Sequence, residues 1–273
     1  MKSIMYVVKV LVAMAAVALV FVFPTGSSAD HSWGNYHWAR TANPFTLRVV
    51  DTNTSDWDDN LNDALGDWSQ STVMDLAYEG GSSAQKDRKR CAAITGKIRS
   101  CNAAYGFNGW LGLATINISG SHITRGTSKM NDSYFNAGGY DETARQHVMC
   151  QEIGHTFGLD HQDESGADLN TCMDYSNDLD NPSPNNHDYQ QLVTIYSHLD
   201  STSTIGFRAP ESDFFGDDPD APHNWGQLVR QSVSGRSSYY ERELPNGTKK
   251  LTHVFWTEEA AARCRPCDHR YDH

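Results

Sequence analysis

The 273-residue sequence contains no apolar run long enough to cross a membrane. The run at residues 10–23 has 14 residues, whereas a spanning helix needs about 20. Lys2 and Lys9 precede this run, and small residues follow it up to Ala29, which is the order found in a secretory signal peptide. An uncleaved membrane anchor is the weaker alternative. We therefore expect residues 1–29 to be a signal peptide, the mature chain to be secreted, and no stable membrane association after cleavage.

Positive charge is also scarce. The formal net charge is −12, and it becomes about −14 once the two lysines of the predicted signal peptide are removed. The only dense basic run is "KDRKR" at residues 86–90. An acidic surface repels phosphate backbones, so the composition excludes nucleic acid as an expected partner.

The sequence has only six cysteines. In an exported chain they favour disulfides over free thiols, although six cysteines allow 15 connectivities. Their positions suggest three local pairs: Cys91 with Cys101, Cys150 with Cys172, and Cys264 with Cys267. A zinc-knuckle interpretation of "CRPCDHRYDH" at the C-terminal end is less favoured, because its ligands would be too crowded.

No internal repeat is present, and the length suits one sizeable domain plus an appendage. We predict a main domain at residues 30–200, followed by a linker and a β-rich C-terminal extension at residues 201–273. Within the extension, Asn246 and Gly247 lie between two β-prone runs, which predicts a hairpin. The other expected elements are strands at 45–50, 73–78 and 109–119, a polar edge-like strand in "HITRGTSKMN", and helices in 55–68, 141–158 and the segment after 181.

The stretch "HVMCQEIGHTFGLDHQ" at residues 147–162 carries the chemistry. In a helix, Gln151 and His155 lie one turn apart on one face, about 6 Å from each other. Gly158 lets the chain leave the helix sharply, so that His161 returns toward the same point. Two histidines and a third donor leave one metal position open, as in catalytic zinc sites. Glu152, on the adjoining flank, suits a general base.

This pattern resembles the metzincin zinc endopeptidases, whose signature is HExxHxxGxxH followed by a methionine turn. The matching run is "QEIGHTFGLDH", and Met173 in "TCMDY" stands where the turn methionine belongs. The resemblance covers roughly residues 40–200. It implies an α+β, metzincin-like fold with a twisted sheet and edge strand, an active-site helix, the methionine turn and a final helix.

The resemblance also implies a function, namely hydrolysis of peptide bonds at one Zn²⁺ ion. Gln151, His155 and His161 would bind the metal, Glu152 would act as general base, and Tyr175 would stabilise the oxyanion. An extended polypeptide substrate would lie along the edge strand near residues 115–130, and the enzyme would be a monomer.

The departure from the signature is Gln151, which replaces the first histidine. The glutamine amide oxygen reaches as far from Cα as a histidine Nε2, but it is a weaker zinc donor, so we expect reduced affinity. His147 is a poor substitute, because it lies about 12 Å from His155 along the helix axis. The alternative to an active enzyme is an inactive secreted metal-binding or protein-binding module that retains the fold.

Two aspartate clusters, at residues 56–59 and 217–220, are candidates for structural Ca²⁺. Both lack the ligand spacing and glycine of a known calcium loop. Solvated acidic loops are the better interpretation of these clusters.

Overall fold

The computed structural model describes residues 31–206 and 221–271 and shows a mixed α/β fold built on one nine-stranded sheet. The predicted signal peptide and the aspartate cluster at 217–220 lie outside the described residues. The sheet order is β3-β2-β4-β6-β5-β9-β8-β7, with β1 pairing the start of β6. The strands are β1 His37–Trp38, β2 Phe45–Thr52, β3 Met74–Gly80, β4 Ile98–Ala103, β5 Trp110–Ser119, β6 His122–Asn131, β7 Gln227–Gln231, β8 Ser237–Glu243 and β9 Thr248–Trp256.

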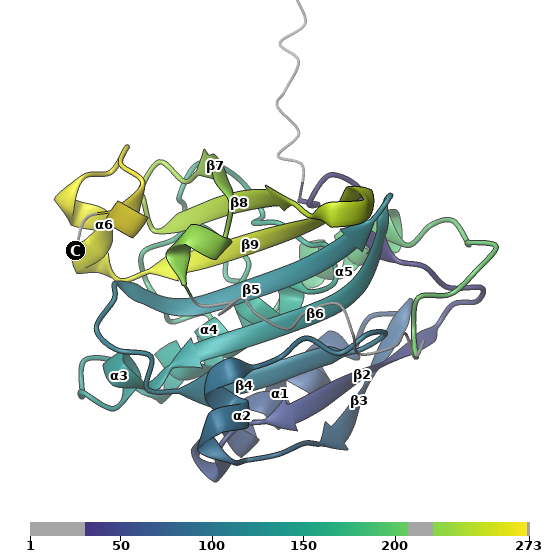
Figure 1. The fold of residues 1–273 in the computed structure, drawn as a ribbon, viewed down its shortest axis with the longest axis horizontal. Coiled ribbons are helices and arrows are strands. Elements are labelled where there is room, and N and C mark those ends of the chain that lie inside the picture. Colours follow the sequence, from purple (N-terminus) through teal and green to yellow (C-terminus); the bar gives the residue numbers. More distant parts are fainter. Residues whose placement is uncertain (1–30, 207–220, 272–273) are drawn as a thin grey trace, which may run out of the picture.

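The sheet is parallel in its first half and antiparallel in its second. Strands β2, β3, β4 and β6 pair in parallel, and every pairing from β6 through β5, β9 and β8 to β7 is antiparallel. The C-terminal extension is β-rich as predicted, and Figure 1 shows it continuing the same sheet. Gly247 ends the short turn between β8 and β9, so the predicted hairpin is confirmed.

The prediction of an edge strand near residues 115–130 is wrong. Strand β5 lies between β6 and β9, and β6 lies between β5 and β4, so both strands are interior. The polar residues Thr127, Ser128 and Lys129 of β6 are nevertheless buried, whereas His122, Thr124 and Arg125 are half-buried. Local sequence patterns could not predict that β5 is interior, because β5 pairs with β9 across more than a hundred residues: Ala114 is opposite His253.

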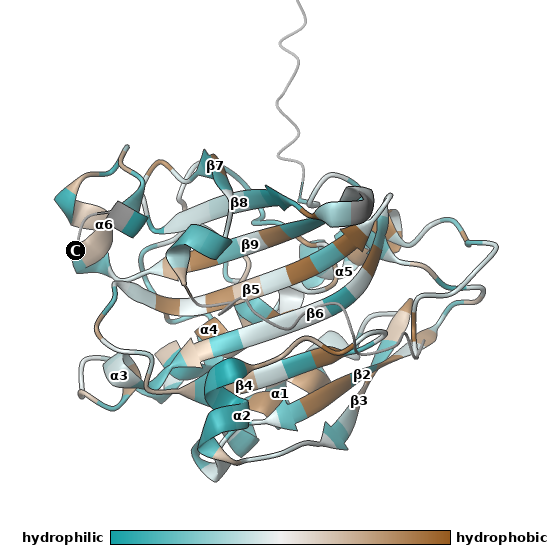
Figure 2. Ribbon diagram, viewed as in Figure 1, coloured by the Kyte–Doolittle hydropathy of each residue, from teal (hydrophilic) through white to brown (hydrophobic). Residues whose placement is uncertain are grey.

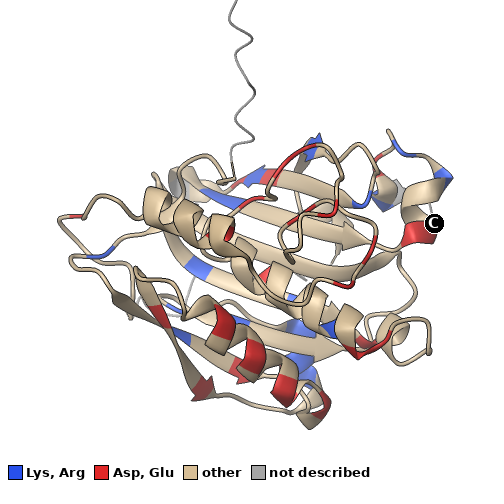
Figure 3. Cartoon of the chain, turned by 180° about the vertical axis from the view of Figure 1, so that it is seen from behind, with Lys and Arg blue, Asp and Glu red and all other residues tan. Residues whose placement is uncertain are grey.

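The main helices pack on one face of the sheet, which is the rear face in Figure 1 and the front face in Figure 3. They are α1 Asp58–Trp68, α4 Glu142–His155 and α5 Asn186–Ile195; the shorter ones are α2 Gln85–Arg90, α3 Asp132–Phe135 and α6 Glu258–Arg263, with 3-10 turns η1 Ser55–Trp57, η3 Pro222–Asn224, η4 Pro245–Gly247 and η5 His269–Tyr271. Helix α1 buries Leu61, Leu65 and Trp68 at the helical spacing that the sequence predicted. Its aspartates face solvent, and Figure 3 shows them as a row of acidic residues.

A second, smaller apolar cluster packs the antiparallel half of the molecule. Trp110 of β5, Trp225, Tyr240 of β8 and Trp256 of β9 are buried together. Figure 2 shows the apolar residues concentrated along β5 and β9. Because this cluster joins β5 to β8 and β9, the extension is held by buried side chains as well as by strand pairing.

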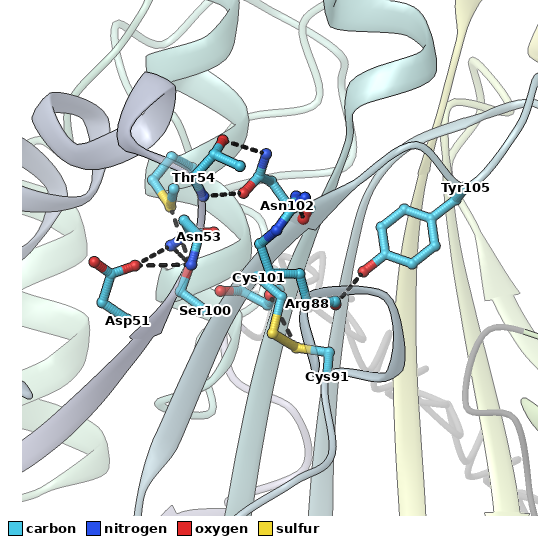
Figure 4. The surroundings of a disulfide bond; sticks show 11 residues. Asp51, Asn53, Thr54, Arg88, Cys91, Ser100, Cys101, Asn102 and Tyr105 are labelled. Carbon is cyan, nitrogen blue, oxygen red and sulfur yellow. Dashed lines mark hydrogen bonds between the residues drawn. A yellow bond between two sulfur atoms is a disulfide. The ribbon is translucent and has the colours of Figure 1, made fainter. Parts of the chain in front are cut away.

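All three predicted disulfides are present. They join Cys91 to Cys101, Cys150 to Cys172, and Cys264 to Cys267. Figure 4 shows the first of these beside Tyr105, whose hydroxyl donates to the carbonyl oxygen of Arg88. The third bond occupies both cysteines of the C-terminal tail, which excludes the zinc-knuckle interpretation. Among the described residues, no helix is long and apolar enough to cross a membrane.

Candidate metal centre

Helix α4 carries the first residues of the candidate site. Its start is fixed by Asp141, whose side chain accepts a hydrogen bond from the backbone N–H of Ala144, as an N-cap residue does. The last two turns hold Gln151, Glu152 and His155, and all three side chains are buried against the sheet. The predicted start near residue 141 is confirmed, whereas α4 ends at His155, three residues before the predicted break at Gly158.

Gly158 turns the chain out of the helix. Its φ is +90°, and a Cβ at this position would lie 2.0 Å from the carbonyl oxygen of Tyr36. Both the left-handed backbone and this close approach require glycine. The backbone N–H of Asp160 then donates to the carbonyl oxygen of His31, which directs the neighbouring His161 back toward α4.

Met173 lies beneath α4 and is fully buried. A Cβ on Gly154 would come within 2.7 Å of its sulfur, so helix and methionine are in close contact. The carbonyl oxygen of Met173 accepts from the backbone N–H of Gln162 at 2.6 Å, and the Cys150–Cys172 disulfide ties the same segment to the helix. This segment is therefore fixed against both α4 and the loop that carries His161.

Three histidines converge in this region: His155 of α4, His161 of the following loop, and His253 of β9. One ring nitrogen from each lies within 4.8 Å of the others. The ring centroids of His155 and His253 are 4.0 Å apart. His253 was not among the residues predicted from the sequence, and it comes from the C-terminal extension.

Each of the three rings is oriented through its Nδ1 atom. His155 Nδ1 lies 2.9 Å from the carbonyl oxygen of Leu159, and His253 Nδ1 lies 3.0 Å from Oε2 of Glu152. His161 Nδ1 contacts the hydroxyl of Tyr239, which itself donates to Oδ1 of Asp160 at 2.6 Å. A carbonyl oxygen and a hydroxyl that donates elsewhere can only accept, so Nδ1 carries the proton in His155 and His161. In His253, Nδ1 carries the proton when Glu152 is an ionised carboxylate.

The Nε2 atoms of His155 and His161 are consequently lone-pair donors, as is that of His253 beside an ionised Glu152. All three Nε2 atoms are buried without a hydrogen-bond partner. Buried polar atoms are normally paired, because leaving one unpaired costs about 1–3 kcal/mol. Imidazole Nε2 is a preferred zinc ligand, and hydrogen bonding of the opposite ring nitrogen is the usual way such ligands are fixed. The residues present therefore fit a zinc ion held by His155, His161 and His253.

Burial keeps the ligand set neutral. It lowers the pKa of His253 to about 3 and the pKa values of His155 and His161 well below the ordinary value, with the neighbouring imidazoles adding to the effect for those two. Metal ligands must be deprotonated to bind, so depressed pKa values keep these nitrogens available at neutral pH.

Glu152 lies at the centre of the site without exposed surface. Its Oε2 is bound by His253, whereas its Oε1 has no hydrogen-bond partner. Burial raises the pKa of this carboxyl well above its usual range. A Cβ on Gly112 of β5 would approach Oε1 to 2.6 Å, so the glycine makes room for the carboxyl.

The structure anchors Gln151 by its amide nitrogen, which donates to the carbonyl oxygen of Cys172 at 2.8 Å. The Gln151 carbonyl oxygen is buried and has no hydrogen-bond partner. This oxygen is the atom that the sequence predicts as a ligand, and that role stays a prediction. His147 lies behind Gln151, with 3.5 Å between their Nε2 atoms, and is not in the converging group.

Aromatic rings enclose the converging histidines. The ring of Tyr175 stacks on that of His161 with centroids 4.0 Å apart, and Trp33 stacks on His155. Tyr239 covers the site from β8, where its ring lies under the guanidinium of Arg230. Arg230 also pairs with Asp160, which completes a chain of contacts from the extension to the His161 loop.

The site is closed in this structure. Glu152, His155 and His253 have no exposed surface, and His161 and Tyr175 are exposed by only 3% and 5%. Strands β8 and β9 provide the cover, through Tyr239 and His253. A polypeptide therefore has no access to the three Nε2 atoms in this conformation.

The structure brings the predicted residues Glu152, His155, His161 and Tyr175 together, and it adds His253 and Tyr239, which sequence reasoning missed. The available signal was weak: His253 is a single histidine in the β-prone run "KKLTHVFW". Only a predicted pairing between that run and residues 110–119 would have placed it at the motif. No protein-family model matches the chain, and comparison with curated proteins finds no match.

Proposed function

We propose that this chain is a secreted, zinc-dependent endopeptidase with a metzincin-like fold, and that His155, His161 and His253 hold its zinc. The observation that carries the proposal is a group of three buried histidines, each with one ring nitrogen within 4.8 Å of the others, whose Nε2 atoms have no hydrogen-bond partner. Three imidazoles leave one position of a tetrahedral site for water or substrate, as in catalytic sites.

Further support comes from the surroundings of the three ligands. Met173 packs under α4, Gly158 turns the chain toward His161, and Tyr175 stacks on that histidine. These positions are those expected from the metzincin resemblance. The proposal therefore rests on both the local geometry and the order of the motifs.

Once a substrate reaches the site, the zinc would polarise a peptide carbonyl and lower the pKa of a bound water to about 7. Glu152 has a free Oε1 atom and a raised pKa, which suit a group that takes up a proton at that oxygen and returns it to the leaving amine. The hydroxyl of Tyr175 would donate to the oxyanion, since burial raises its pKa and keeps it protonated.

We further propose that the closed conformation is a resting form. Strand β9 pairs with β5 along residues 110–119, which is the side on which an extended polypeptide would bind by strand addition. Substrate binding then requires β8 and β9 to move away from β5 and to withdraw His253. The carbonyl oxygen of Gln151, on α4, would take the vacated ligand position.

The test is digestion of an unfolded protein such as reduced, alkylated casein by the full zinc-loaded chain. Urea is raised in steps to concentrations below the onset of global unfolding, because such conditions favour local opening of the sheet. We expect cleavage that increases with urea in the wild type and is absent in Glu152→Gln. Glu259→Gln, an exposed residue of α6, is the matched control and should cleave like the wild type.

The second candidate is a zinc-binding module without proteolytic activity. The complete burial of the site and the filled β5 edge favour it specifically. In the same assay, a wild type that holds zinc yet cleaves no more than Glu152→Gln at any urea concentration would overturn the endopeptidase and support this module.

A further inference from the structure

The disulfide between Cys264 and Cys267 is more accessible than the other two. The four cysteines of those two bonds are buried, and none is exposed by more than 1%. Cys264 and Cys267 are half-buried, and Arg265 and Pro266 between them are exposed. A thiol in solution can therefore approach this bond in the folded chain. Neither cysteine belongs to the candidate metal centre.

We propose that Cys264 and Cys267 form a thiol–disulfide exchange site that oxidises pairs of thiols in other polypeptides. A thiolate of such a dithiol attacks one sulfur of the pair, which breaks the Cys264–Cys267 bond and forms a mixed disulfide. The second thiolate of the dithiol then attacks the mixed disulfide and releases the reduced pair. Two electrons and two protons pass from the dithiol to the two cysteines. A small disulfide such as oxidised glutathione restores the original bond by the same exchange.

Reduction of this bond would cost the fold little stability. Its cysteines are three positions apart in the sequence, whereas the other two pairs are separated by 10 and 22 positions. Closing a short loop removes less entropy from the unfolded chain, so a disulfide across it stabilises the folded chain less. The pair can therefore alternate between disulfide and dithiol while the chain stays folded. An exchange site requires this alternation.

Contacts other than the disulfide hold this segment in place. The carbonyl oxygen of Cys267 accepts from Nε2 of Gln231, on β7, at 3.0 Å. Oδ1 of Asp268 accepts from the hydroxyl of Tyr240, on β8, at 3.0 Å. The guanidinium of Arg270 donates to two carbonyl oxygens of the segment before β7. None of these contacts involves the sulfur atoms, so the reduced pair keeps its support and can form the bond again.

The charges beside the pair favour its thiolate form, which leaves when the disulfide is attacked and attacks in the return step. Arg263 and Arg265 flank Cys264 in the sequence, and both are exposed. The end of α6 adds a partial negative charge of about half a unit, which two guanidinium groups exceed. The charge of Asp268 is compensated, because Nε of Arg270 lies 2.9 Å and 3.0 Å from its two carboxylate oxygens.

The test is the oxidation of reduced, unfolded ribonuclease A by the full zinc-loaded chain in the presence of oxidised glutathione. Every chain in the assay carries Glu152→Gln, so that peptide hydrolysis does not degrade the substrate. We expect the free thiols of the ribonuclease to disappear faster than with glutathione alone. The double variant Cys264→Ser, Cys267→Ser should return the rate to that of glutathione alone. Arg265→Glu should slow the reaction, whereas the matched control Arg265→Lys should not.

A second measurement identifies the disulfide that exchanges. The folded chain is incubated with reduced glutathione, its free thiols are alkylated, and its peptides are analysed by mass spectrometry. We expect the label on Cys264 and Cys267 and none on the four buried cysteines. An unlabelled pair, or a double variant as fast as its parent, would overturn the exchange site. Labelling without faster oxidation of the ribonuclease would also overturn it, because polypeptide thiols would then not be its substrate. None of these results bears on the proposed endopeptidase.

Discussion

His253 and Glu152 are 101 residues apart in the sequence, and in the structure Nδ1 of the histidine lies 3.0 Å from Oε2 of the glutamate. Neither side chain has exposed surface. A carboxylate that holds the Nδ1 of a histidine directs the opposite nitrogen toward a metal. This contact therefore joins the C-terminal extension to the motif helix and places a third imidazole beside His155 and His161.

The first prediction concerns His253→Ala. Loss of a direct ligand should weaken zinc binding by more than the 10–100-fold that changes around a ligand typically cost. Competition with a chromogenic chelator measures the affinity. The exposed His223→Ala is the control, and equal affinities of the two variants would mean that His253 is no ligand.

A second prediction is that Gln151→His rescues His253→Ala. Position 151 lies one helical turn from His155, so an imidazole there can reach the same ion. The double variant should regain most of the zinc affinity lost by His253→Ala, whereas Gln146→His, placed on the same helix, should not. No recovery in the double variant would indicate that positions 151 and 253 do not serve one ion.

The third prediction separates two roles of Glu152. In Glu152→Gln the amide oxygen still accepts from His253, so zinc affinity should change little. In Glu152→Ala that contact is gone, and affinity should fall about 10–100-fold. Any peptide hydrolysis should fall at least about 100-fold in both variants, because neither can take up the proton. Isothermal titration with zinc measures the affinity, and a casein assay measures the hydrolysis. Identical zinc affinities of Glu152→Gln and Glu152→Ala would contradict the proposal that Glu152 orients His253.

Fourth, the Cys150–Cys172 disulfide should contribute more stability than the Cys264–Cys267 disulfide. Their sequence separations are 22 and 3, and loop-closure entropy gives about 3 kcal/mol for the first and about 1.5 kcal/mol for the second. Urea unfolding of the two double Cys→Ser variants measures the difference. The variant that lacks the Cys150–Cys172 disulfide should also bind zinc more weakly, since this disulfide ties the segment of Met173 to α4. Equal losses of stability in the two variants would contradict the prediction.

A fifth prediction concerns the pH dependence of the zinc-free chain. Burial lowers the pKa of His147 to about 4 and that of His253 to about 3. As the pH falls below about 6.5, these histidines take up protons in the unfolded chain but stay neutral in the folded chain. The free energy of unfolding therefore falls. Together, the two rings should lower the free energy of unfolding by about 2 kcal/mol between pH 6.5 and pH 5.5. His155 and His161 act in the same direction, whereas Glu152, whose pKa is raised, opposes them.

Urea unfolding of the zinc-free chain at the two pH values tests this expectation. His223→Ala should show the same pH dependence as the wild type, because its side chain is exposed. His147→Asn should show a weaker pH dependence, since it removes one of the buried rings that stay neutral in the folded chain. A free energy of unfolding that is constant or rises toward pH 5.5 would contradict the buried neutral imidazoles.

The parts of the fold that could be predicted are those that local patterns specify. Helical spacing of Leu61, Leu65 and Trp68 predicted α1, and Gly158 marked the end of the motif helix. The disulfide pairs followed from short separations in sequence. Each of these features depends on residues within about two dozen positions, where local stereochemistry and loop closure dominate.

The parts that could not be predicted depend on distant pairing. An exposed edge at β5 was expected, but β9 covers it through a ladder that includes Ala114 and His253. Likewise, Nε2 of His122 contacts Oδ1 of Asp200, a residue more than 70 positions away in the sequence. Neither strand periodicity nor motif spacing carries information on which strand fills an edge. The sequence therefore predicted a metal site with a weak third ligand, and the structure adds a buried histidine of β9 beside the predicted residues.

The most direct test of the three-histidine centre is an anomalous difference map at the zinc absorption edge from crystals of the zinc-loaded full chain. The account predicts a peak about 2.1 Å from the Nε2 atoms of His155, His161 and His253. No peak among these residues, or a peak without His253 as a ligand while β9 remains paired with β5, would contradict it.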